Sequence, residues 1–236
     1  MCASYGLGGG PPLPKGLGPM TERGDLTVLS EWIEARDGKA AITGKNARNL
    51  NPVVHEFGGE RALELGWWWL WLDGSGPVKF SAFNSRDDKL LRSWKRPFQR
   101  RGLLPASWYV EKKVRFGLPD GSTFGIAAVT STVTTETGDT LLTYSMVTRD
   151  AVGEAAGTHP RMPLVIPEEL TDEWLDTDRP GDAELIDDVV LASDEISRAI
   201  VASTVAAQSN ALDPAAFERI EQRMGELARQ IEEVAQ

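Results

Sequence analysis

Residues 123–147 read TFGIAAVTSTVTTETGDTLLTYSMV. The runs 123–133 and 141–147 within this stretch are rich in Val, Ile, Thr and aromatic residues, which favour β-strands. Between the two runs, Thr137-Gly138-Asp139 is typical of a turn. The stretch therefore predicts two strands joined by a turn, and it makes β-sheet the centre of the fold.

Three further strand-like runs precede this stretch, at residues 67–72, 78–83 and 108–116, and turn signals such as Asp73-Gly74 separate them. Short helices are expected at residues 26–35 and 87–94. The sequence thus predicts an α+β protein, with a mostly antiparallel β-sheet or barrel and peripheral helices.

Helical patterns replace the strand patterns after Pro167, at residues 168–175 and 184–205. A last helix is expected to begin at Asp213, a good N-cap, with Pro214 at its first position. Its apolar residues recur every three or four positions: Phe217, Ile220, Met224, Leu227, Ile231 and Val234.

This stripe is too short to define a coiled coil, so packing on its own domain is the favoured interpretation. A homodimer, or a protein partner bound through the helix at 214–234, is the alternative.

The net charge of −10 is unevenly distributed along the chain. Residues 1–170 sum to +1, whereas residues 171–236 sum to −11. Since a phosphate backbone responds to the local field, the total charge does not exclude nucleic acid as a ligand. We therefore expect a domain over residues 1–176 and an acidic helical C-terminal extension over residues 177–236.

The most basic stretch, residues 92–115, has a local charge of +7. Within it, cations such as Arg92 and Arg96 alternate with the aromatic residues Trp94 and Phe98. Sites for single-stranded nucleic acid combine phosphate-binding cations with flat faces for bases. An amphipathic helix whose aromatic residues face the core would give the same pattern, and the sequence leaves both interpretations open.

Cys2 is the only cysteine among 236 residues, which excludes an internal disulfide and suits a reducing cytoplasm. The N-terminus lacks the basic and apolar regions of a signal peptide. The most apolar run, residues 67–72, is too short to cross a bilayer. We therefore expect a cytoplasmic protein without a membrane partner.

The position of Cys2 suggests a specific chemistry. Removal of Met1 would leave an α-amine and a thiol on adjacent carbons, and an α-amine has a pKa of about 7.7–8.0. Such an amine adds to an aldehyde to give a Schiff base, and the thiol can then close a thiazolidine ring. From Cys2 alone, an ordinary chain start is the more common explanation.

Other candidate residues are scattered along the chain. His159 lies in a proline-rich loop, where it could serve as acid or base, whereas His55 lies in an apolar run typical of a structural histidine. Glu111 lies within the strand-like run 108–116, where an exposed carboxylate paired with neighbouring cations is the more common outcome. Asn84 could equally be a helix N-cap. Two isolated histidines and one cysteine do not predict a metal site, and no cofactor is expected.

Five short motifs follow one another along the chain: MCAS at residues 1–4, NSR at 84–86, RRGLLPASWYVE at 100–111, TRDA at 148–151 ahead of HPRMP at 159–163, and PEELTDEWL at 167–175. In this order they resemble the SRAP (SOS response-associated peptidase) family, whose motifs begin MCGR and continue with N-x-R, RRCLIPAxxFYE, TTEA and HxRMP. The similarity extends over about residues 1–176.

The resemblance implies that the protein captures abasic sites in single-stranded DNA. Cys2, exposed by self-removal of Met1, would form a thiazolidine crosslink with the ring-opened deoxyribose. Asn84 would hold the cysteine and sugar, Glu111 would move protons, and His159 would stabilise the sugar oxygen and assist reversal. Arg86, Thr148 and Arg161 match DNA-holding positions of the family.

Ser4 replaces the family arginine that helps to bind phosphate, so we expect either a lower DNA affinity or a replacement contact from Lys15, Arg92 or Arg96. Two other functions stay open: a cysteine peptidase that uses Cys2 and His159 on other proteins, and a non-catalytic module that binds single-stranded DNA. A crosslinking assay with abasic DNA distinguishes the three.

Overall fold

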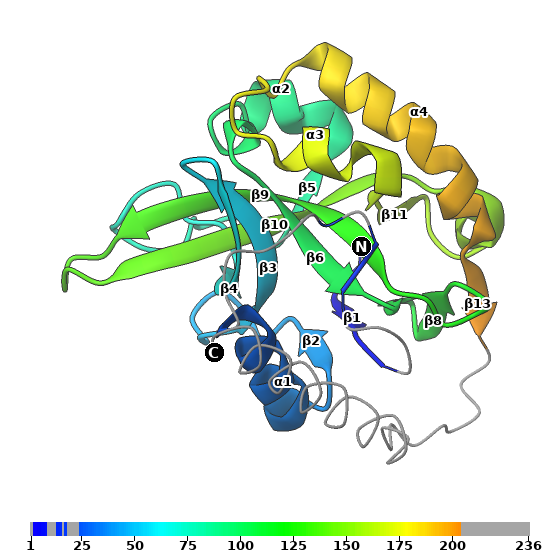
Figure 1. Ribbon diagram of the computed structural model, residues 1–236, viewed down its shortest axis with the longest axis horizontal. Coiled ribbons are helices and arrows are strands. Elements are labelled where there is room, and N and C mark those ends of the chain that lie inside the picture. The colour runs from blue at the N-terminus through cyan, green and yellow to red at the C-terminus, as the bar shows by residue number, and fades with distance from the viewer. Residues whose placement is uncertain (1, 9–12, 16, 18–23, 204–236) are drawn as a thin grey trace, which may run out of the picture. The chain divides into compact units, whose positions relative to one another are not determined.

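The computed structural model describes residues 2–8, 13–15, 17 and 24–203 (Figure 1). These residues belong to a compact unit that spans Met1–Thr204, and the second unit is Val205–Gln236. The predicted helix that begins at Asp213 and its apolar stripe lie outside the described residues.

Five strands close into a barrel: β3 (Leu50–Phe57), β4 (Glu60–Trp68), β6 (Arg101–Ala106), β9 (Phe124–Thr134) and β10 (Thr140–Asp150). Around the barrel the order is β10, β4, β3, β6 and β9, and β9 pairs again with β10. All neighbours are antiparallel except β10 and β4, which run parallel. The predicted α+β class with a mostly antiparallel barrel is confirmed.

The stretch at residues 123–147 forms the β9–β10 hairpin. Its register extends from Thr140 opposite Thr134 to Met146 opposite Ala128. The backbone N–H of Thr135 donates to the carbonyl oxygen of Asp139 at 2.9 Å and closes the predicted turn. Most side chains of β10 are buried because neighbouring elements cover both faces of this strand.

Short strands extend the barrel at the end of β10. Strand β5 (Asn84–Arg86) runs parallel to β10, and β11 (Arg161–Pro163) runs antiparallel to it. Thr148 on β10 therefore lies opposite both Arg86 and Pro163. A further strand, β12 (Val165–Ile166), pairs with β9. This pairing brings three motifs that are distant in sequence to one end of β10.

A second, antiparallel sheet holds the start of the chain. Its order is β13, β8, β7, β1 and β2. Strand β1 (Ser4–Gly6) lies between β7 (Trp108–Glu111) and β2 (Lys39–Ala41), with Ser4 opposite Val110 and Tyr5 opposite Tyr109. On the other side of β7 lies β8 (Val114–Gly117), and β13 (Val201–Ser203) pairs with β8 at the edge of the sheet. Residues 2–4 of the first motif are thereby placed beside the motif at 100–111.

The single strand predicted at residues 108–116 is wrong, because the chain turns back at Lys112 and Lys113. Both residues have positive φ angles, 46° and 69°, as a two-residue hairpin turn of this type requires. Phe116 consequently lies opposite Tyr109, with the two rings stacked at 5.2 Å. Neither lysine is a typical residue for such a turn, so the sequence offered no signal for it.

Residues 78–83 are also not a strand, contrary to the prediction, and regular pairing begins only at β5. Two tryptophans satisfy backbone carbonyls of this irregular segment. The indole N–H of Trp68 donates to Phe83 at 2.8 Å, and that of Trp69 donates to Val78 at 3.2 Å. The run at residues 67–72 is a strand only in its first two residues, which belong to β4.

The described helices are α1 (Gly24–Arg36), α2 (Leu90–Ser93), α3 (Thr171–Leu175) and α4 (Ala183–Ala199). The 3-10 segments are η1 (Asp87–Lys89), η2 (Pro97–Gln99), η3 (Gly153–Gly157) and η4 (Glu168–Leu170). In Figure 1, α1 lies on one side of the barrel, and α2, α3 and α4 lie on the other. Helices were correctly predicted at 26–35, 87–94 and 168–175. Within the described chain, no helix is long and apolar enough to cross a membrane.

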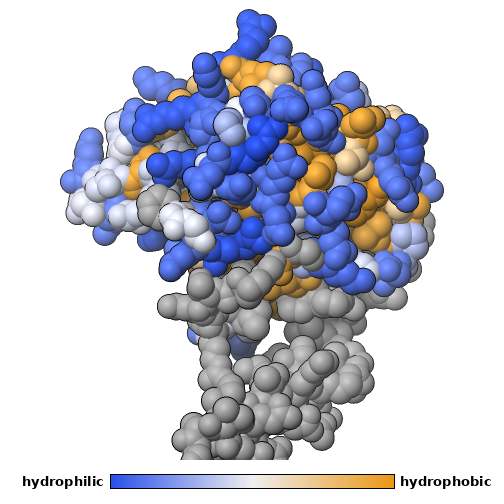
Figure 2. All heavy atoms as spheres, turned by 45° about the horizontal axis from the view of Figure 1, so that its top comes forward, coloured by the Kyte–Doolittle hydropathy of each residue, from blue (hydrophilic) through white to orange (hydrophobic). Residues whose placement is uncertain are grey.

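Helix α4 packs on the same core as the barrel through Leu185, Ile186 and Val189. The side chain of Asp182 caps it by accepting a hydrogen bond from the N–H of Leu185 at 3.0 Å. It ends at Ala199, and β13 replaces the last part of the helix predicted at 184–205. On the face shown in Figure 2, hydrophilic side chains dominate and the apolar ones form separate patches.

Candidate active site

Cys2 is buried at the junction of the two sheets. Its side chain is 2 % exposed, and its Sγ donates a hydrogen bond to the backbone oxygen of Ser4 at 3.3 Å. The amide Nδ2 of Asn84 donates to the carbonyl oxygen of Cys2 at 2.7 Å. Because Asn84 is the first residue of β5, its pairing with β10 fixes the amide that holds Cys2.

Burial raises the pKa of the Cys2 thiol to about 12, the Ser4 backbone opposes this shift, and the Glu111 carboxylate adds to it. The thiol is therefore protonated at neutral pH. A protonated thiol is a weak nucleophile, so an amine on the same residue would have to react first.

We expect Cys2 to react with iodoacetamide about 10³-fold more slowly in the folded protein than in urea at pH 7. The pKa rise from about 9 to about 12 reduces the thiolate fraction at pH 7 by this order. The folded rate should rise about tenfold per pH unit between pH 7 and 9, without levelling. Alkylation followed by mass spectrometry checks this, and a plateau near pH 8 would contradict the raised pKa.

Glu111 is the last residue of β7 and is 7 % exposed. The turn at Lys112 and Lys113 ends the strand directly after it and leaves both lysines exposed. The carboxylate is close enough to Cys2 and Tyr109 to raise the pKa of both groups. A buried carboxylate beside a thiol can act as a proton acceptor.

Tyr109 is a site residue that the sequence reasoning did not single out. It is 1 % exposed, and burial raises its pKa well above the ordinary range, with further contributions from Cys2 and Glu111. The signal was available, because Tyr109 lies two residues before Glu111 and a strand repeats its faces every two residues.

His159 lies between η3 and β11 and is half-buried. The Nδ1 of its ring accepts a hydrogen bond from the backbone N–H of Arg161 at 3.0 Å. The backbone N–H of His159 donates to the backbone oxygen of Ala155, also at 3.0 Å. The structure places Asn84 in hydrogen-bonding contact with Cys2, and it places Glu111 close enough to raise the pKa of the Cys2 thiol. His159 is connected to this group indirectly: it precedes β11, which pairs with β10, and β10 also pairs with β5, the strand of Asn84.

Thr148 and Arg161 are buried and have internal partners. The guanidinium of Arg161 contacts Asp150 at 2.7 Å and Asp87 at 2.5 Å, and it donates to the backbone oxygen of Thr148. The hydroxyl of Thr148 donates to the backbone oxygen of Ser85 at 3.4 Å. Neither side chain presents a free surface to a phosphate in this arrangement.

The other predicted cations are exposed. Arg86 is half-exposed and forms a two-pronged pair with Asp88, with both N···O distances at 2.8 Å. Arg92 and Arg96 are exposed, whereas Trp94 and Phe98 are buried. Of the two interpretations of this basic stretch, the structure supports the one in which the aromatic residues face the core.

Among the described residues, no group of three or more His, Cys, Asp or Glu side chains is arranged so that it could hold a metal ion. The polar groups around Cys2 are an amide, a carboxylate and a phenol, which suit hydrogen bonding and proton transfer.

The fold is similar to two solved structures from Bordetella bronchiseptica. One protein has 18 % identity and a TM-score of 0.57, over 87 % of this chain and all of that one. The other, a phage-related protein, has 17 % identity and a TM-score of 0.56, over 87 % of this chain and 95 % of that one. No significant match was found among curated proteins.

A family model named SOS response associated peptidase (SRAP) matches residues 39–208. Cys2 lies before the matched region, so its place in the site rests on the contacts described above. The match covers most of the chain, and the barrel and the four motifs between residues 84 and 175 fall within it. The chain therefore belongs to the SOS response associated peptidase (SRAP) family.

Proposed function

We propose that this protein captures abasic sites in single-stranded DNA through a thiazolidine bond to Cys2. Membership of the SRAP family implies abasic-site processing associated with the SOS response. The observation that carries the proposal is the convergence of Asn84 and Glu111 on Cys2, which is 2 % exposed. These three residues come from separate motifs and meet only in the fold.

The reaction begins with removal of Met1, which frees the α-amine of Cys2. The amine attacks the aldehyde carbon of the ring-opened deoxyribose, and the oxygen leaves as water with both amine hydrogens. The thiol then adds across the C=N bond, with sulfur on carbon and the proton on nitrogen. No oxidant or reductant is needed, and the high pKa of the thiol suits this order of steps.

Each neighbour has a distinct role in this scheme. Asn84 positions Cys2 through its 2.7 Å hydrogen bond. Glu111 accepts and returns protons during Met1 removal and sugar ring opening. His159 holds the sugar oxygen as acid or base and assists reversal.

Burial of Cys2 favours single-stranded over duplex DNA. An aldehyde must enter the domain to reach a residue that is 2 % exposed, and a splayed single strand can deliver it without unpairing. Arg86, Arg92 and Arg96 supply exposed positive charge for the backbone. Thr148 and Arg161 would join them after local rearrangement of their internal contacts.

Replacing Asp88 with asparagine should increase affinity for an undamaged single-stranded oligonucleotide about two- to fivefold. Asp88 pairs with Arg86 at 2.8 Å, and an exposed pair of this kind is worth about 0.2–1 kcal/mol, so its loss frees Arg86 for phosphate. Fluorescence anisotropy at fixed salt measures the change. Asp120→Asn makes the same charge change in a distant turn and should have a smaller effect; equal effects would show that only net charge matters.

A denaturing gel with one abasic oligonucleotide tests the proposed function. A shifted band that Cys2→Ala removes supports covalent capture. Binding without a covalent band favours a non-catalytic module for single-stranded DNA. Neither result, together with cleavage of a peptide substrate, favours a cysteine peptidase.

We place the reaction in the cytoplasm and divide the chain at residue 176. The acidic extension at 177–236, with a net charge of −8, limits non-specific DNA binding. The helix at 214–234 would pack on its own domain, or it would form a homodimer or bind a protein partner. Light scattering with and without residues 205–236 distinguishes these roles.

A further inference from the structure

Three buried side-chain atoms near Cys2 have no hydrogen-bond partner within the described part of the chain: the Oγ of Ser4, the hydroxyl of Tyr109 and the Oδ1 of Asn84. The last two belong to side chains that can face a bound molecule. Leaving such an atom unpaired costs about 1–3 kcal/mol, so a native protein rarely keeps one without a reason. Asn84 donates to the backbone oxygen of Cys2, and Tyr109 lies opposite Tyr5 on the strand that pairs with β1, the strand that follows Cys2. A hydroxyl-bearing ligand at Cys2 would supply partners for both atoms.

Stacking and strand pairing fix the position of the Tyr109 ring. It stacks on Phe116 at 5.2 Å and 16°, and β7 pairs with β1 on one side and β8 on the other. The neighbouring tyrosines are different, because the hydroxyls of Tyr5 and Tyr144 pair with each other at 2.7 Å. Of these three buried tyrosines, Tyr109 alone keeps a hydroxyl without such a partner among the described residues.

We propose that Tyr109 is a further catalytic residue of the Cys2 site, where its hydroxyl donates a hydrogen bond to the aldehyde oxygen of the substrate. The Oδ1 of Asn84 accepts a hydrogen bond from a hydroxyl group of the same molecule. The site is therefore built for a hydroxy aldehyde, the chemical class to which a ring-opened abasic sugar belongs. This inference rests on the proposed function and adds a catalytic residue to it.

The chemistry requires a donor at this position. When the Cys2 amine bonds to the aldehyde carbon, the π electrons of the C=O bond move onto oxygen, which becomes the strongest acceptor in the site. Burial and the Glu111 carboxylate raise the pKa of Tyr109, so its hydroxyl stays protonated and donates without losing its proton. The oxygen then departs as water with the two amine hydrogens, and Tyr109 is unchanged.

Tyr109→Phe removes the hydroxyl and keeps the stacking on Phe116. We expect its crosslinking rate with an abasic oligonucleotide to fall about 10- to 100-fold, as for other donors to a developing oxyanion. Its melting temperature should stay equal or rise, because the lost hydroxyl has no partner. Tyr144→Phe is the matched control: it removes a paired hydroxyl and should lower the melting temperature while leaving the crosslinking rate within about threefold.

Glycolaldehyde separates failure of this inference from failure of the proposed function. Each protein is incubated with this small hydroxy aldehyde. Mass spectrometry of the N-terminal peptide then detects an adduct, whose mass is that of the aldehyde minus one water. Slower adduct formation by Tyr109→Phe supports the inference even if abasic DNA gives no crosslink. Equal rates for the wild type and Tyr109→Phe overturn the inference, and no adduct on the wild type with either aldehyde overturns both proposals.

Discussion

Replacement of Arg101 by methionine is expected to lower the free energy of unfolding by about 3–5 kcal/mol. Arg101 is 1 % exposed, and its guanidinium donates to four backbone oxygens: Phe98 at 3.0 Å, Trp174 at 2.6 Å, Asp176 at 2.5 Å and Arg179 at 2.7 Å. Methionine fills much of the volume but leaves these carbonyls unsatisfied. The barrel strand β6 would then lose the hydrogen bonds that hold it to the segment after α3.

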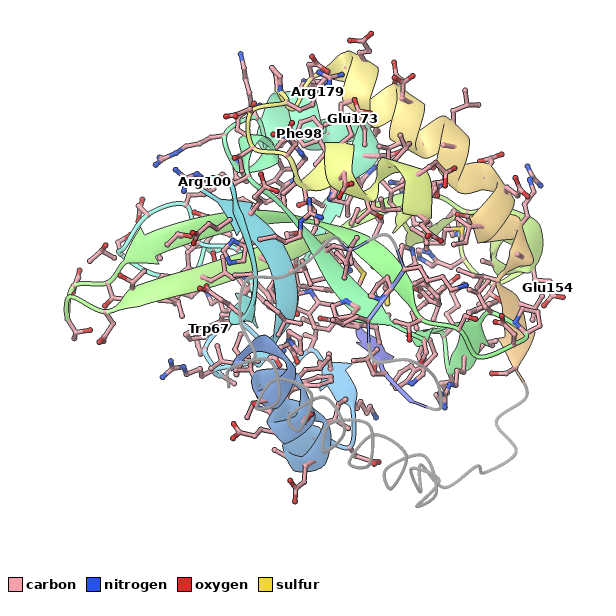
Figure 3. All side chains as sticks on the ribbon, in the orientation of Figure 1. Trp67, Phe98, Arg100, Glu154, Glu173 and Arg179 are labelled. Atoms are coloured by element: carbon pink, nitrogen blue, oxygen red, sulfur yellow. The ribbon has the colours of Figure 1, made fainter. Side chains whose placement is uncertain are left out.

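Urea unfolding followed by tryptophan fluorescence measures this change. The segment concerned is visible in Figure 3, where Glu173 and Arg179, paired at 3.0 Å, lie near Phe98. Arg100→Met alters the adjacent, exposed arginine and should change stability by less than about 0.5 kcal/mol. A loss below about 1 kcal/mol for Arg101→Met would show that its contacts are not needed to hold this segment.

Gly6→Ala should reduce both stability and crosslinking. A Cβ atom at Gly6 would lie 2.3 Å from the backbone oxygen of Gly38 and 2.4 Å from the ring of Trp108. Relieving these clashes must move β1 away from its neighbours, at a cost of about 1–3 kcal/mol. Because Cys2 precedes β1, the same displacement should slow crosslinking by about 10²-fold, the order expected for a misplacement of about 1 Å.

Urea unfolding and single-turnover crosslinking test the two parts separately. Gly157→Ala is the control for stability, since a Cβ there would meet nothing within 4 Å. If Gly6→Ala crosslinks at the wild-type rate while unfolding more easily, the position of β1 does not determine the reactivity of Cys2. That result would weaken the account of how the fold presents this residue.

The barrel strands were predictable where local composition and tertiary pairing agree. Strands β9 and β10 have β-branched residues and a glycine-containing turn, and both formed as expected. The Lys112-Lys113 turn was not predictable, because its positive φ angles are imposed by the pairing of β7 with β8. Residues 78–83 have strand composition, but tryptophan side chains satisfy their backbone in place of a neighbouring strand.

The candidate site was predictable as a set of residues and not as a geometry. The motifs placed Asn84 and Glu111 in order behind Cys2, but only the two sheets show that they meet it. The cations illustrate the limit best. Nothing in the sequence around Arg161 indicates a partner, whereas Asp87 and Asp150 pair with it in the fold. No local pattern predicts such long-range partners.

The most direct test of covalent capture is the mass of the crosslinked N-terminal peptide. Wild-type protein is incubated with a single-stranded abasic oligonucleotide, denatured without borohydride, and digested with nuclease and protease. We predict an adduct on Cys2 equal to the deoxyribose remnant minus one water, on a peptide that lacks Met1. An adduct on a lysine, one that survives only after borohydride reduction, or retained Met1 on the crosslinked peptide would contradict the thiazolidine mechanism.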